Sequence, residues 1–471
     1  MKKTIPYKLA PEVSKHPRIV AGISVCQKLR SAGWAAYWVG GAVRDLLINP
    51  QKVPGDIDIS TDAPFDEICK TLPDTRAIGK AFGVGLVGEG KHSFEVATFR
   101  KEADYADRRH PSLVGPGTME EDSARRDFTL NAMYFDPQAG IIVDFHEGLQ
   151  DLKKKTISCV GDAHVRLHED PLRILRLFRF SANFAFKIEA NTGKAAEQLG
   201  SELLHVSKER VLLEISKLKS AAVPLFAQLF KQVQNHLVGC NTPAGASPKF
   251  PWTSFSIPAS VPASSPGMLF AAICAANEFP LQSDWLKIFQ DWPFSLEEKA
   301  QLELFQRLQN SQFRLPTNTE VVADWRSFLE SMRWLQRQSR ITAEAALWIL
   351  NWPGMDDSKN SQFINFLSLA LNKTVSESEE LQHQPIGSIL ESWLRGEAQS
   401  LREKANKSLD GQKEKSALGW ARLLIDTNIL LKKISCTPAS GPSVLMLNAE
   451  SELEEICNTA IQLAGLARRP Q

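Results

Sequence analysis

The feature that most constrains this chain is a five-residue segment in which carboxylates alternate with isoleucines, DIDIS at 56–60. In a strand, successive side chains point to opposite faces, so Asp56 and Asp58 share one face while Ile57 and Ile59 share the other. The isoleucines need a core beneath them, which turns both carboxylates outward at a spacing that a divalent cation can bridge. A solvated strand edge is the ordinary explanation of such a pair, so its neighbourhood decides the interpretation.

A strand and a glycine turn precede this segment. AYWV at 36–39 is predicted to be a strand that breaks at Gly40 and Gly41 into a helix. The backbone N–H groups of such a turn can point at an anion, and Arg44 follows one helical turn later. A phosphate cradle and a metal-binding pair are therefore predicted close together.

The first 155 residues mix strand and helix signals. Further strands are predicted at 83–88, 93–99, 130–135 and 141–145, and helices at 22–31, 63–70 and 120–126. From residue 160 onward apolar residues recur at helical spacing, and strand signals stop. The predicted fold is α+β, with an N-terminal head on a mixed five-stranded sheet, followed by an all-helical neck, body and tail.

At 471 residues the chain is too long for one ordinary core, so several domains are expected. The predicted parts are a head at 1–155, a helical neck at 156–235, a helical body at 236–360 and a helical tail at 361–471. The body begins with a segment at 240–266 that is dense in Pro, Ser and Ala and is predicted to be an irregular insertion. Tryptophans beyond it are expected to be core anchors.

Composition excludes several classes of protein. Seven cysteines occur without Cys-x-x-Cys or Cys/His ligand spacing, so neither a zinc site nor a disulfide framework is predicted, and reduced thiols fit a cytoplasmic protein. No apolar run approaches the length of a membrane span, so no membrane partner is expected. The net charge of +1 gives no overall attraction to a polyanion, so nucleic-acid binding would use local clusters of Arg and Lys.

Five motifs follow one another along the first half of the chain. They are VGGAVRD (39–45), GDIDIS (55–60), ARRDFTLNAMYFDP (124–137), HEDPLRILRLFRF (168–180) and ERVLLE (209–214). In order and spacing they closely resemble class II tRNA nucleotidyltransferases, the CCA-adding enzymes, and the related bacterial poly(A) polymerases. The resemblance covers roughly residues 33–220. It implies metal-dependent transfer of nucleotides from NTPs to an RNA 3′ end.

The resemblance assigns the catalytic carboxylates. It implies that Asp56 and Asp58 bind Mg²⁺ and that Glu95, on the adjacent strand, is a further catalytic carboxylate. Pairing of Glu95 with Arg100 or Lys91 is the alternative for that residue. In a two-metal scheme one ion lowers the pKa of the RNA 3′-hydroxyl and the other neutralises the leaving pyrophosphate.

The other motifs are assigned to the nucleotide. Arg126 is expected at the triphosphate and Asp127 at the ribose, while Asn131 either orients this loop or only forms a turn. Asp170 and Arg173 match the residues that read the base edge. An acceptor-only carboxylate and a donor-only guanidinium can pair with C or A without a nucleic-acid template.

Further arginines lie on the same helix and on the last motif. Arg176 and Arg179 match nucleotide contacts of the family, although an exposed, ion-paired helix face is the alternative. Arg210 and Glu214, spaced i, i+4, are predicted to be structural and to lock the neck helices by an ion pair. Gly40, Gly41 and Arg44 complete the predicted nucleotide-binding set.

Two segments favour the tRNA-repairing branch of the family. IGKAFGVGLVGEG (78–90) stands where the poly(A) polymerases have a basic stretch, and TFRKEADYADRRHPSLV (98–114) resembles a full-length flexible loop that CC-adding enzymes shorten. A CCA-adding enzyme that acts on the tRNA acceptor end with CTP and ATP is therefore favoured. An A-adding enzyme comes second and a poly(A) polymerase third. Gly115, Pro116 and Gly117 replace a run that is usually β-prone, which leaves the choice between CCA and A addition open.

A different class is also considered, an inactive RNA-binding protein on the same fold. The intact motif residues oppose it. No His-Asp metal motif follows the neck, so no attached phosphohydrolase is predicted. Lys153, Lys154, Lys155 and Arg166 are candidates for contacts to RNA phosphates, with a solvated lysine run as the alternative.

Overall fold

The computed structural model describes residues 2–79, 83–103, 113–233, 266–276 and 285–309, together with short pieces between 334 and 399. The chain divides into two compact units, Met1–Pro243 and Ala244–Gln471. All predicted site residues lie in the first unit. The predicted insertion, apart from its last residue, and most of the predicted tail lie outside the described residues.

One mixed sheet forms the head. Its strands are β1 (Lys3–Pro6), β2 (Ala36–Val39), β3 (Asp58–Thr61), β4 (Thr75–Gly79), β5 (Val84–Glu89), β6 (His92–Thr98), β9 (Met133–Asp136) and β10 (Ile141–Asp144). They form eight strands in the order β1-β10-β9-β2-β3-β6-β5-β4. β3 and β6 are parallel, and the other neighbours in this sheet are antiparallel.

The predicted mixed α+β head is confirmed, but five strands is the wrong number. The two edge strands, β1 with the sequence KTIP and β4 with TRAIG, show no apolar alternation because an edge strand buries little side-chain surface. The strand predicted at 130–135 begins only at Met133, because Thr129–Asn131 form a 3-10 turn, η2.

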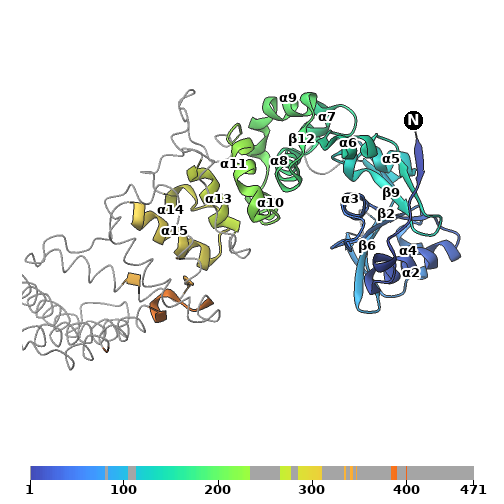
Figure 1. Cartoon of the computed structure of the whole chain (residues 1–471), viewed down its shortest axis with the longest axis horizontal. Coiled ribbons are helices and arrows are strands. Elements are labelled where there is room, and N and C mark those ends of the chain that lie inside the picture. Colours follow the sequence, from blue (N-terminus) through green and yellow to red (C-terminus); the bar gives the residue numbers. More distant parts are fainter. Residues whose placement is uncertain are drawn as a thin grey trace, which may run out of the picture. The chain divides into compact units, whose positions relative to one another are not determined.

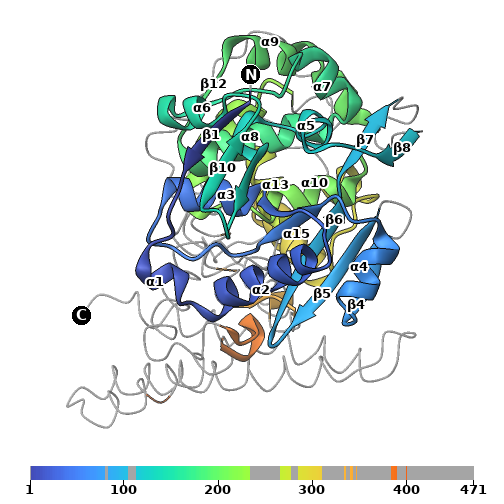
Figure 2. The same cartoon turned by 90° about the vertical axis from the view of Figure 1, so that its right-hand side faces the viewer.

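The two faces of the sheet carry different cores. Trp38, Phe135 and Ile142 belong to a large cluster with the helices α2 (Pro17–Ser31), α3 (Gly41–Ile48) and α4 (Phe65–Thr71). Figure 2 shows α2 lying along the sheet, together with the short helix α1 (Pro11–Ser14). A residue adjacent to each of these in its strand points to the opposite face, where Val39, Tyr134 and Val143 form a smaller cluster with Phe99.

A short ribbon stands apart from the main sheet. β7 (Arg100–Ala103) and β8 (Leu113–Pro116) pair antiparallel, next to the helix α5 (Met119–Ala124), as Figure 2 shows. Thr118 and Glu121 cap this helix reciprocally. Strand β8 extends to Pro116 although Gly115, Pro116 and Gly117 replace a run that is usually β-prone. Part of the predicted flexible loop, 104–112, lies outside the described residues.

The neck surrounds helix α8. Its elements are α6 (Gly148–Lys154), β11 (Thr156–Ile157), α7 (Ala163–Glu169), α8 (Leu172–Phe184), β12 (Lys187–Ile188), α9 (Ala190–Gln198), η3 (Gly200–His205), α10 (Lys208–Ile215), η4 (Ser220–Ala222) and α11 (Val223–Phe230). α8 packs against α10 and α11 (Figure 1). The prediction of an all-helical neck is wrong in one detail, since β11 and β12 form a parallel pair. Two-residue strands are too short to show a sequence pattern.

The second unit is described in part. Its helices are α13 (Pro266–Ala276), α14 (Trp285–Ile288) and α15 (Leu296–Gln309). Phe270, Phe289, Trp292 and Phe294 contact one another through their rings, and Trp292 is 3% exposed. The prediction that Trp292 anchors a core is confirmed. Among the helices that the structure describes, none is both long and apolar enough to cross a membrane.

Candidate active site

A row of side chains crosses four strands on the face opposite to α2. The register pairs Glu95 with Asp58, Asp58 with Val39, and Val39 with Tyr134. Paired residues of adjacent strands point to the same face, so Glu95 and Asp58 are direct neighbours there. The structure therefore brings Glu95 beside Asp58, as the resemblance implied.

The carboxylate pair keeps its predicted alternation although the strand is shorter than predicted. β3 starts at Asp58, and Asp56 precedes it. Both aspartates are exposed, whereas Ile57 and Ile59 are 3% and 1% exposed. Desolvation at the carboxyl group, followed by the charge of Glu95, raises the pKa of Asp58 to about 6, and Arg126 opposes the shift.

The donor set fits a hard divalent cation that is bound together with a nucleotide. Among the described residues, no group of three or more acids, histidines or cysteines lies close enough to hold a metal by itself. Mg²⁺ commonly uses one or two carboxylates and completes its shell with water and substrate phosphates. Asp56 and Asp58 are such a pair, and Glu95 is their neighbour rather than a third ligand in a preformed cluster.

The glycine turn lies against this row. Gly40 follows β2 directly and has φ +66° and ψ −126°, a conformation that L side chains rarely adopt. A Cβ at Gly40 would lie 3.4 Å from Nη1 of Arg126. Gly40 therefore gives both the sharp turn into α3 and a close approach to the arginine.

Replacement of Gly40 by Ala is expected to lower the free energy of unfolding by about 1–3 kcal/mol, the usual cost of a non-glycine residue in such a conformation. Gly41→Ala is the matched control, because the nearest atom to its Cβ would be Nη2 of Arg44 at an ordinary 3.5 Å. Thermal unfolding of both variants measures the difference. Equal melting temperatures for the two would contradict a conformational requirement at Gly40.

Arg126 lies between the glycine turn and β3. Its Nη2 lies 3.4 Å from Oγ of Ser60 and 3.1 Å from Oδ2 of Asp122, and its guanidinium stacks over the Tyr134 ring at 5.4 Å. The side chain is 17% exposed. Arg126, the glycine turn and Asp58 thus meet at one place.

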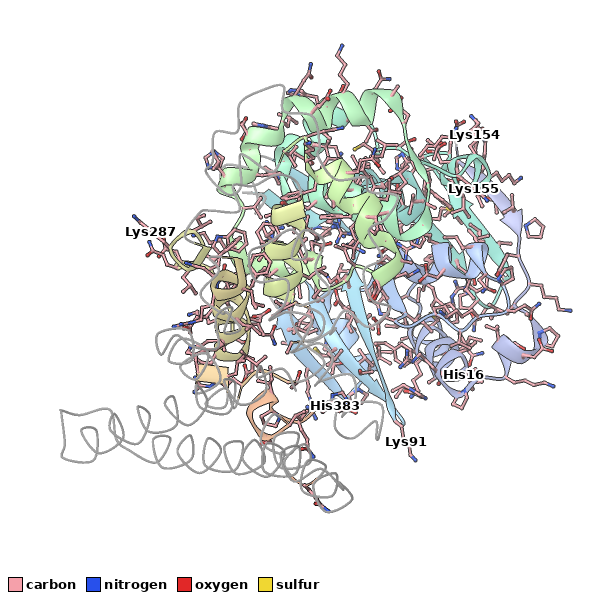
Figure 3. The ribbon with its side chains drawn as sticks, turned by 60° about the vertical axis from the view of Figure 1, so that its left-hand side comes forward. His16, Lys91, Lys154, Lys155, Lys287 and His383 are labelled. Atoms are coloured by element: carbon pink, nitrogen blue, oxygen red, sulfur yellow. The ribbon has the colours of Figure 1, made fainter. Side chains whose placement is uncertain are left out.

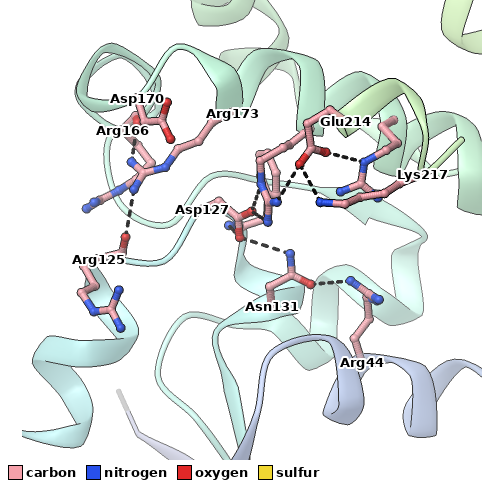
Figure 4. A network of polar contacts seen from close by, with 12 residues as sticks. Arg44, Arg125, Asp127, Asn131, Arg166, Asp170, Arg173, Glu214 and Lys217 are labelled. Carbon is pink, nitrogen blue, oxygen red and sulfur yellow. Dashed lines mark hydrogen bonds and ion pairs between the residues drawn. The ribbon is translucent and has the colours of Figure 1, made fainter. Parts of the chain in front are cut away.

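Asp127 is the centre of a polar network that joins head and neck (Figure 4). Its Oδ1 accepts from the Phe128 N–H at 2.8 Å and from Nδ2 of Asn131 at 3.1 Å. Its Oδ2 accepts from Nε and Nη2 of Arg176 at 2.9 and 2.6 Å. Burial alone would raise its pKa, but the charge and hydrogen bonds of Arg176 and the Asn131 amide hold the pKa of Asp127 at about 2.

The side-chain amide of Asn131 connects this network to Arg44. Nη1 of Arg44 donates to Oδ1 of Asn131 at 2.7 Å, and its guanidinium stacks over Phe180 and Phe184 of α8 at 5.2 and 4.8 Å. Asn131 is therefore more than a turn former, since both ends of its amide are used. In this structure the Arg44 guanidinium thus contacts the neck, pairs with Asp45 at 2.7 Å and lies beside Gly41 of the glycine turn.

The two predicted arginines of α8 meet one acid of α10. Arg176 and Arg179 donate to Glu214 at 3.3 and 2.6 Å, and Lys217 lies 3.3 Å from the same carboxylate. Glu214 is 3% exposed, so the helix face is ion-paired but not solvated. Burial acts to raise the pKa of Glu214, but the charges of Arg179, Arg176 and Lys217 outweigh it and lower the pKa.

The predicted base-reading pair lies at the α7–α8 junction. Asp170 accepts from Nη2 of Arg210 at 2.8 Å. Arg210 and Glu214 thus each pair with another partner, which differs from the ion pair predicted between them. Nη1 of Arg173 donates to Glu169 at 2.8 Å, and its Nη2 donates to the carbonyl of Arg125 at 3.2 Å (Figure 4).

The predicted phosphate-contacting cations divide into two kinds. Lys153, Lys154 and Lys155 are exposed at the end of α6, and Figure 3 shows the last two pointing outward. Arg166 is instead engaged with Glu169 at 2.6 Å. Three further residues carry no motif that would have identified them: Glu169, which orients two arginines, and Asp122 and Tyr134, which hold Arg126.

The sheet order, the glycine turn, the carboxylate row and the arginines are the features expected of a nucleotidyltransferase head, here joined to a helical neck. The family model described as the poly A polymerase head domain matches residues 36–158. The resemblance recognised from the motifs is therefore confirmed for this segment, which matches the head domain of that family.

The sequence relatives are CCA-adding enzymes. Identity is 43% over 197 residues to that of Bacillus licheniformis, which covers 42% of this chain and 49% of the relative. Identity is 39% over 221 residues to that of Leuconostoc citreum, which covers 45% of this chain and 54% of the relative. The matched segment thus spans about half the length of these relatives.

Solved structures resemble the chain over a longer range. The Bacillus stearothermophilus CCA-adding enzyme in complex with CTP has a TM-score of 0.56 at 21% identity and covers 96% of this chain and 98% of its own. The Thermotoga maritima CCA-adding enzyme complexed with tRNA has a TM-score of 0.52 at 19% identity, with 97% and 99% covered. At these identities the likeness establishes a shared fold.

Proposed function

We propose that this chain is a CCA-adding tRNA nucleotidyltransferase, which adds C, C and A to the tRNA 3′ end from CTP and ATP without a nucleic-acid template. The observation that carries the proposal is the contact between Arg173 and the carbonyl of Arg125, at 3.2 Å. It brings Arg173 next to Arg125, the neighbour of Arg126, which lies beside the glycine turn and Asp58. One nucleotide can therefore reach both places, with its phosphates at Arg126 and its base at the junction.

Each protein group has a defined task in this reaction. Bound Mg²⁺ would be held by Asp56 and Asp58, and it would promote ionisation of the RNA 3′-hydroxyl and neutralise charge on the departing pyrophosphate. Glu95 adds negative charge beside the pair. Arg126 and the N–H groups at Gly40 and Gly41 would bind the triphosphate. No covalent enzyme intermediate is required, because the attacking hydroxyl belongs to the RNA.

The ribose and the neck contacts depend on the Asp127 network. Four donors occupy the Asp127 carboxylate in this structure. A contact to a ribose hydroxyl would therefore replace or share one of them, and the Asn131 amide, with the longest of the four distances, is the one most easily displaced. Asp127 would thus favour ribonucleotides while it keeps its pair with Arg176. Arg179 would not contact the nucleotide directly but would act through its pair with Glu214.

The base would be selected by Asp170 and Arg173. The contacts of Asp170 to Arg210 and to the Leu172 N–H use two of about four acceptor positions. The carboxylate thus retains capacity for a base amino group, and Arg173 can donate to a ring nitrogen or carbonyl. This pairing satisfies the edges of C and A and disfavours those of U and G.

Asp170→Ala and Arg173→Ala are expected to relax the choice among NTPs before they abolish transfer. A good base-edge pair contributes about 1–3 kcal/mol of discrimination, so the preference for CTP over UTP should fall about 10- to 100-fold in kcat/KM. His168→Ala, an exposed residue of the same junction, is the control. Unchanged nucleotide preference in both variants would remove the base-reading role.

The RNA partner is proposed to be the acceptor end of tRNA, bound mainly through shape and backbone. The exposed lysines at 153–155 suit phosphate contacts. A cytoplasmic location would give access to tRNA, CTP, ATP and Mg²⁺ together.

Extension of three matched tRNA transcripts tests the function. The transcripts lack CCA, end in CC, or end in CCA, and each is incubated with CTP, ATP or both in the presence of Mg²⁺. Growth of the first by CCA followed by arrest is expected. Addition of a single A to the CC-ended transcript alone would define an A-adding enzyme, and open-ended A addition would define a poly(A) polymerase. The absence of any incorporation would favour an inactive RNA-binding protein.

A further inference from the structure

We infer, on the basis of the proposed function, that Asp122 is a positioning residue that aims the Arg126 guanidinium at the nucleotide triphosphate. Asp122 belongs to α5 and to none of the sequence motifs that point to the reaction. It is 0% exposed, so it acts through other residues rather than by touching the substrate.

The Asp122 carboxylate gathers donors from three segments. Oδ1 accepts from Nε and Nη2 of Arg125 at 2.9 and 2.6 Å. Oδ2 accepts from Nη2 of Arg126 at 3.1 Å and from the Tyr134 hydroxyl at 2.6 Å. The backbone N–H of Arg100, at the start of β7, lies 3.4 Å from Oδ1. One buried acid therefore connects α5, the central strand β9 and the base of the β7–β8 ribbon.

These contacts fix which side of Arg126 faces the site. Nη2 is directed toward Asp122 and Ser60, while Nη1 lies toward the glycine turn, 3.4 Å from where a Cβ of Gly40 would be. Nε of Arg126 is buried and has no hydrogen-bond partner within the described part of the chain. Nη1 is thus the donor directed to the glycine turn, where phosphate oxygens would be bound.

The charge balance supports the same role. The single carboxylate of Asp122 lies between two guanidinium groups, so the cluster keeps one net positive charge. Tyr134 adds a ring beneath Arg126 and a hydroxyl donor to Asp122, so the carboxylate cannot turn away without losing a buried hydrogen bond. Arg126 is held rigid by these contacts before the nucleotide arrives, which reduces the ordering cost of binding.

The test measures binding of pyrophosphate and of Mg²⁺–ATP to the full chain by calorimetry, with nucleotide transfer measured separately. Asp122→Asn is expected to raise the Kd of pyrophosphate and the KM for ATP about tenfold or more, while kcat changes less than about threefold. Asp122→Asn combined with Arg126→Gln should bind pyrophosphate no more weakly than Arg126→Gln alone, because both changes remove one function. Glu120→Gln, an exposed acid of the same helix, is the matched control with the same charge change.

Two further variants distinguish a positioning role of Asp122 from a general loss of folding. Tyr134→Phe leaves the carboxylate in place and removes one donor, and it should raise the Kd of pyrophosphate about two- to fivefold at an unchanged circular dichroism spectrum. Asp122→Glu should recover part of the lost affinity. Unchanged pyrophosphate binding in Asp122→Asn and Tyr134→Phe, or effects that add to those of Arg126→Gln, would overturn the positioning role even if the chain transfers nucleotides. Conversely, pyrophosphate binding that depends on Asp122 in a chain without transfer would overturn only the proposed function.

Discussion

Replacement of Asp58 by Ala is expected to abolish nucleotide transfer while the head stays folded. Among the contacts of the described residues, no hydrogen bond or ion pair holds the Asp58 carboxylate, and its neighbours in the row are the acids Glu95 and Asp56. Removal of one of several like charges relieves repulsion, so the thermal midpoint of the variant in EDTA should be equal to or above that of the wild type. Loss of activity without loss of stability is the signature of a residue kept for chemistry.

The measurement is single-turnover extension of a tRNA transcript, with thermal unfolding recorded on the same samples. Asp56→Ala should behave in the same way, and the wild type treated with EDTA should fall to the same level. Asp66→Ala, an exposed acid at the start of α4, is the control and should retain full activity. Transfer at the wild-type rate by either variant would exclude the replaced aspartate as an essential metal ligand and would contradict the paired site. Glu95→Gln would show whether the third carboxylate contributes to the rate.

Local patterns predicted the centre of the head well. The alternation at 56–60 gives the face of the two aspartates, and Gly40 is where the chain turns from β2 into α3. These features depend on residues close together in the sequence, so hydrophobic alternation and backbone freedom are sufficient to find them. The edge strands β1 and β4 were missed, because pairing with a neighbour rather than an apolar pattern determines them.

The roles of the neck arginines could not be predicted in the same way. Arg176 and Arg179 carry no sequence sign that shows whether they face a ligand, water or an acid. In the structure their partners are Asp127 and Glu214, which lie 49 and 35 residues away in the sequence. Only the packing of α8 against the head and α10 brings these charges together.

The burial of Asp122 could not be predicted from the sequence either, although two of its partners, Arg126 and Tyr134, lie only a few residues away. It follows two other acids in the helix MEEDSA, a pattern that is typical of a solvent-exposed acidic first turn. The residue is instead buried, since β9 brings Tyr134 over it and the next loop brings back Arg126. Which acid of the helix becomes buried depends on the strand that packs over it. The spacing of residues in the sequence does not predict that packing.

Replacement of Glu214 by Gln is expected to give the largest loss of stability in the neck. Glu214 is 3% exposed, and its carboxylate pairs with Arg179, Arg176 and Lys217. Without it, the buried Arg179 guanidinium loses its counter-charge, while Arg176 keeps its pair with Asp127, and the unpaired buried charge typically costs about 3–5 kcal/mol. Hydrogen–deuterium exchange of α8 and α10 in the full chain reports this opening directly, and protection should fall by at least about a hundredfold. Glu209→Gln, an exposed acid of the same helix, should leave exchange unchanged.

The pH dependence of the same exchange gives an independent check. The folded-state pKa values of Asp127, at about 2, and of Glu214 are lowered relative to ordinary carboxyl groups. Groups of this kind contribute stability that is present above the unfolded pKa near 4 and is lost as the pH falls through the folded value. For Asp127 the contribution is about 2 kcal/mol. The wild-type neck should therefore lose protection progressively between about pH 5 and pH 2, corrected for intrinsic exchange, and Glu214→Gln should show a shallower slope. A slope identical to that of the wild type would mean that Glu214 is not the acid that holds α8 to α10.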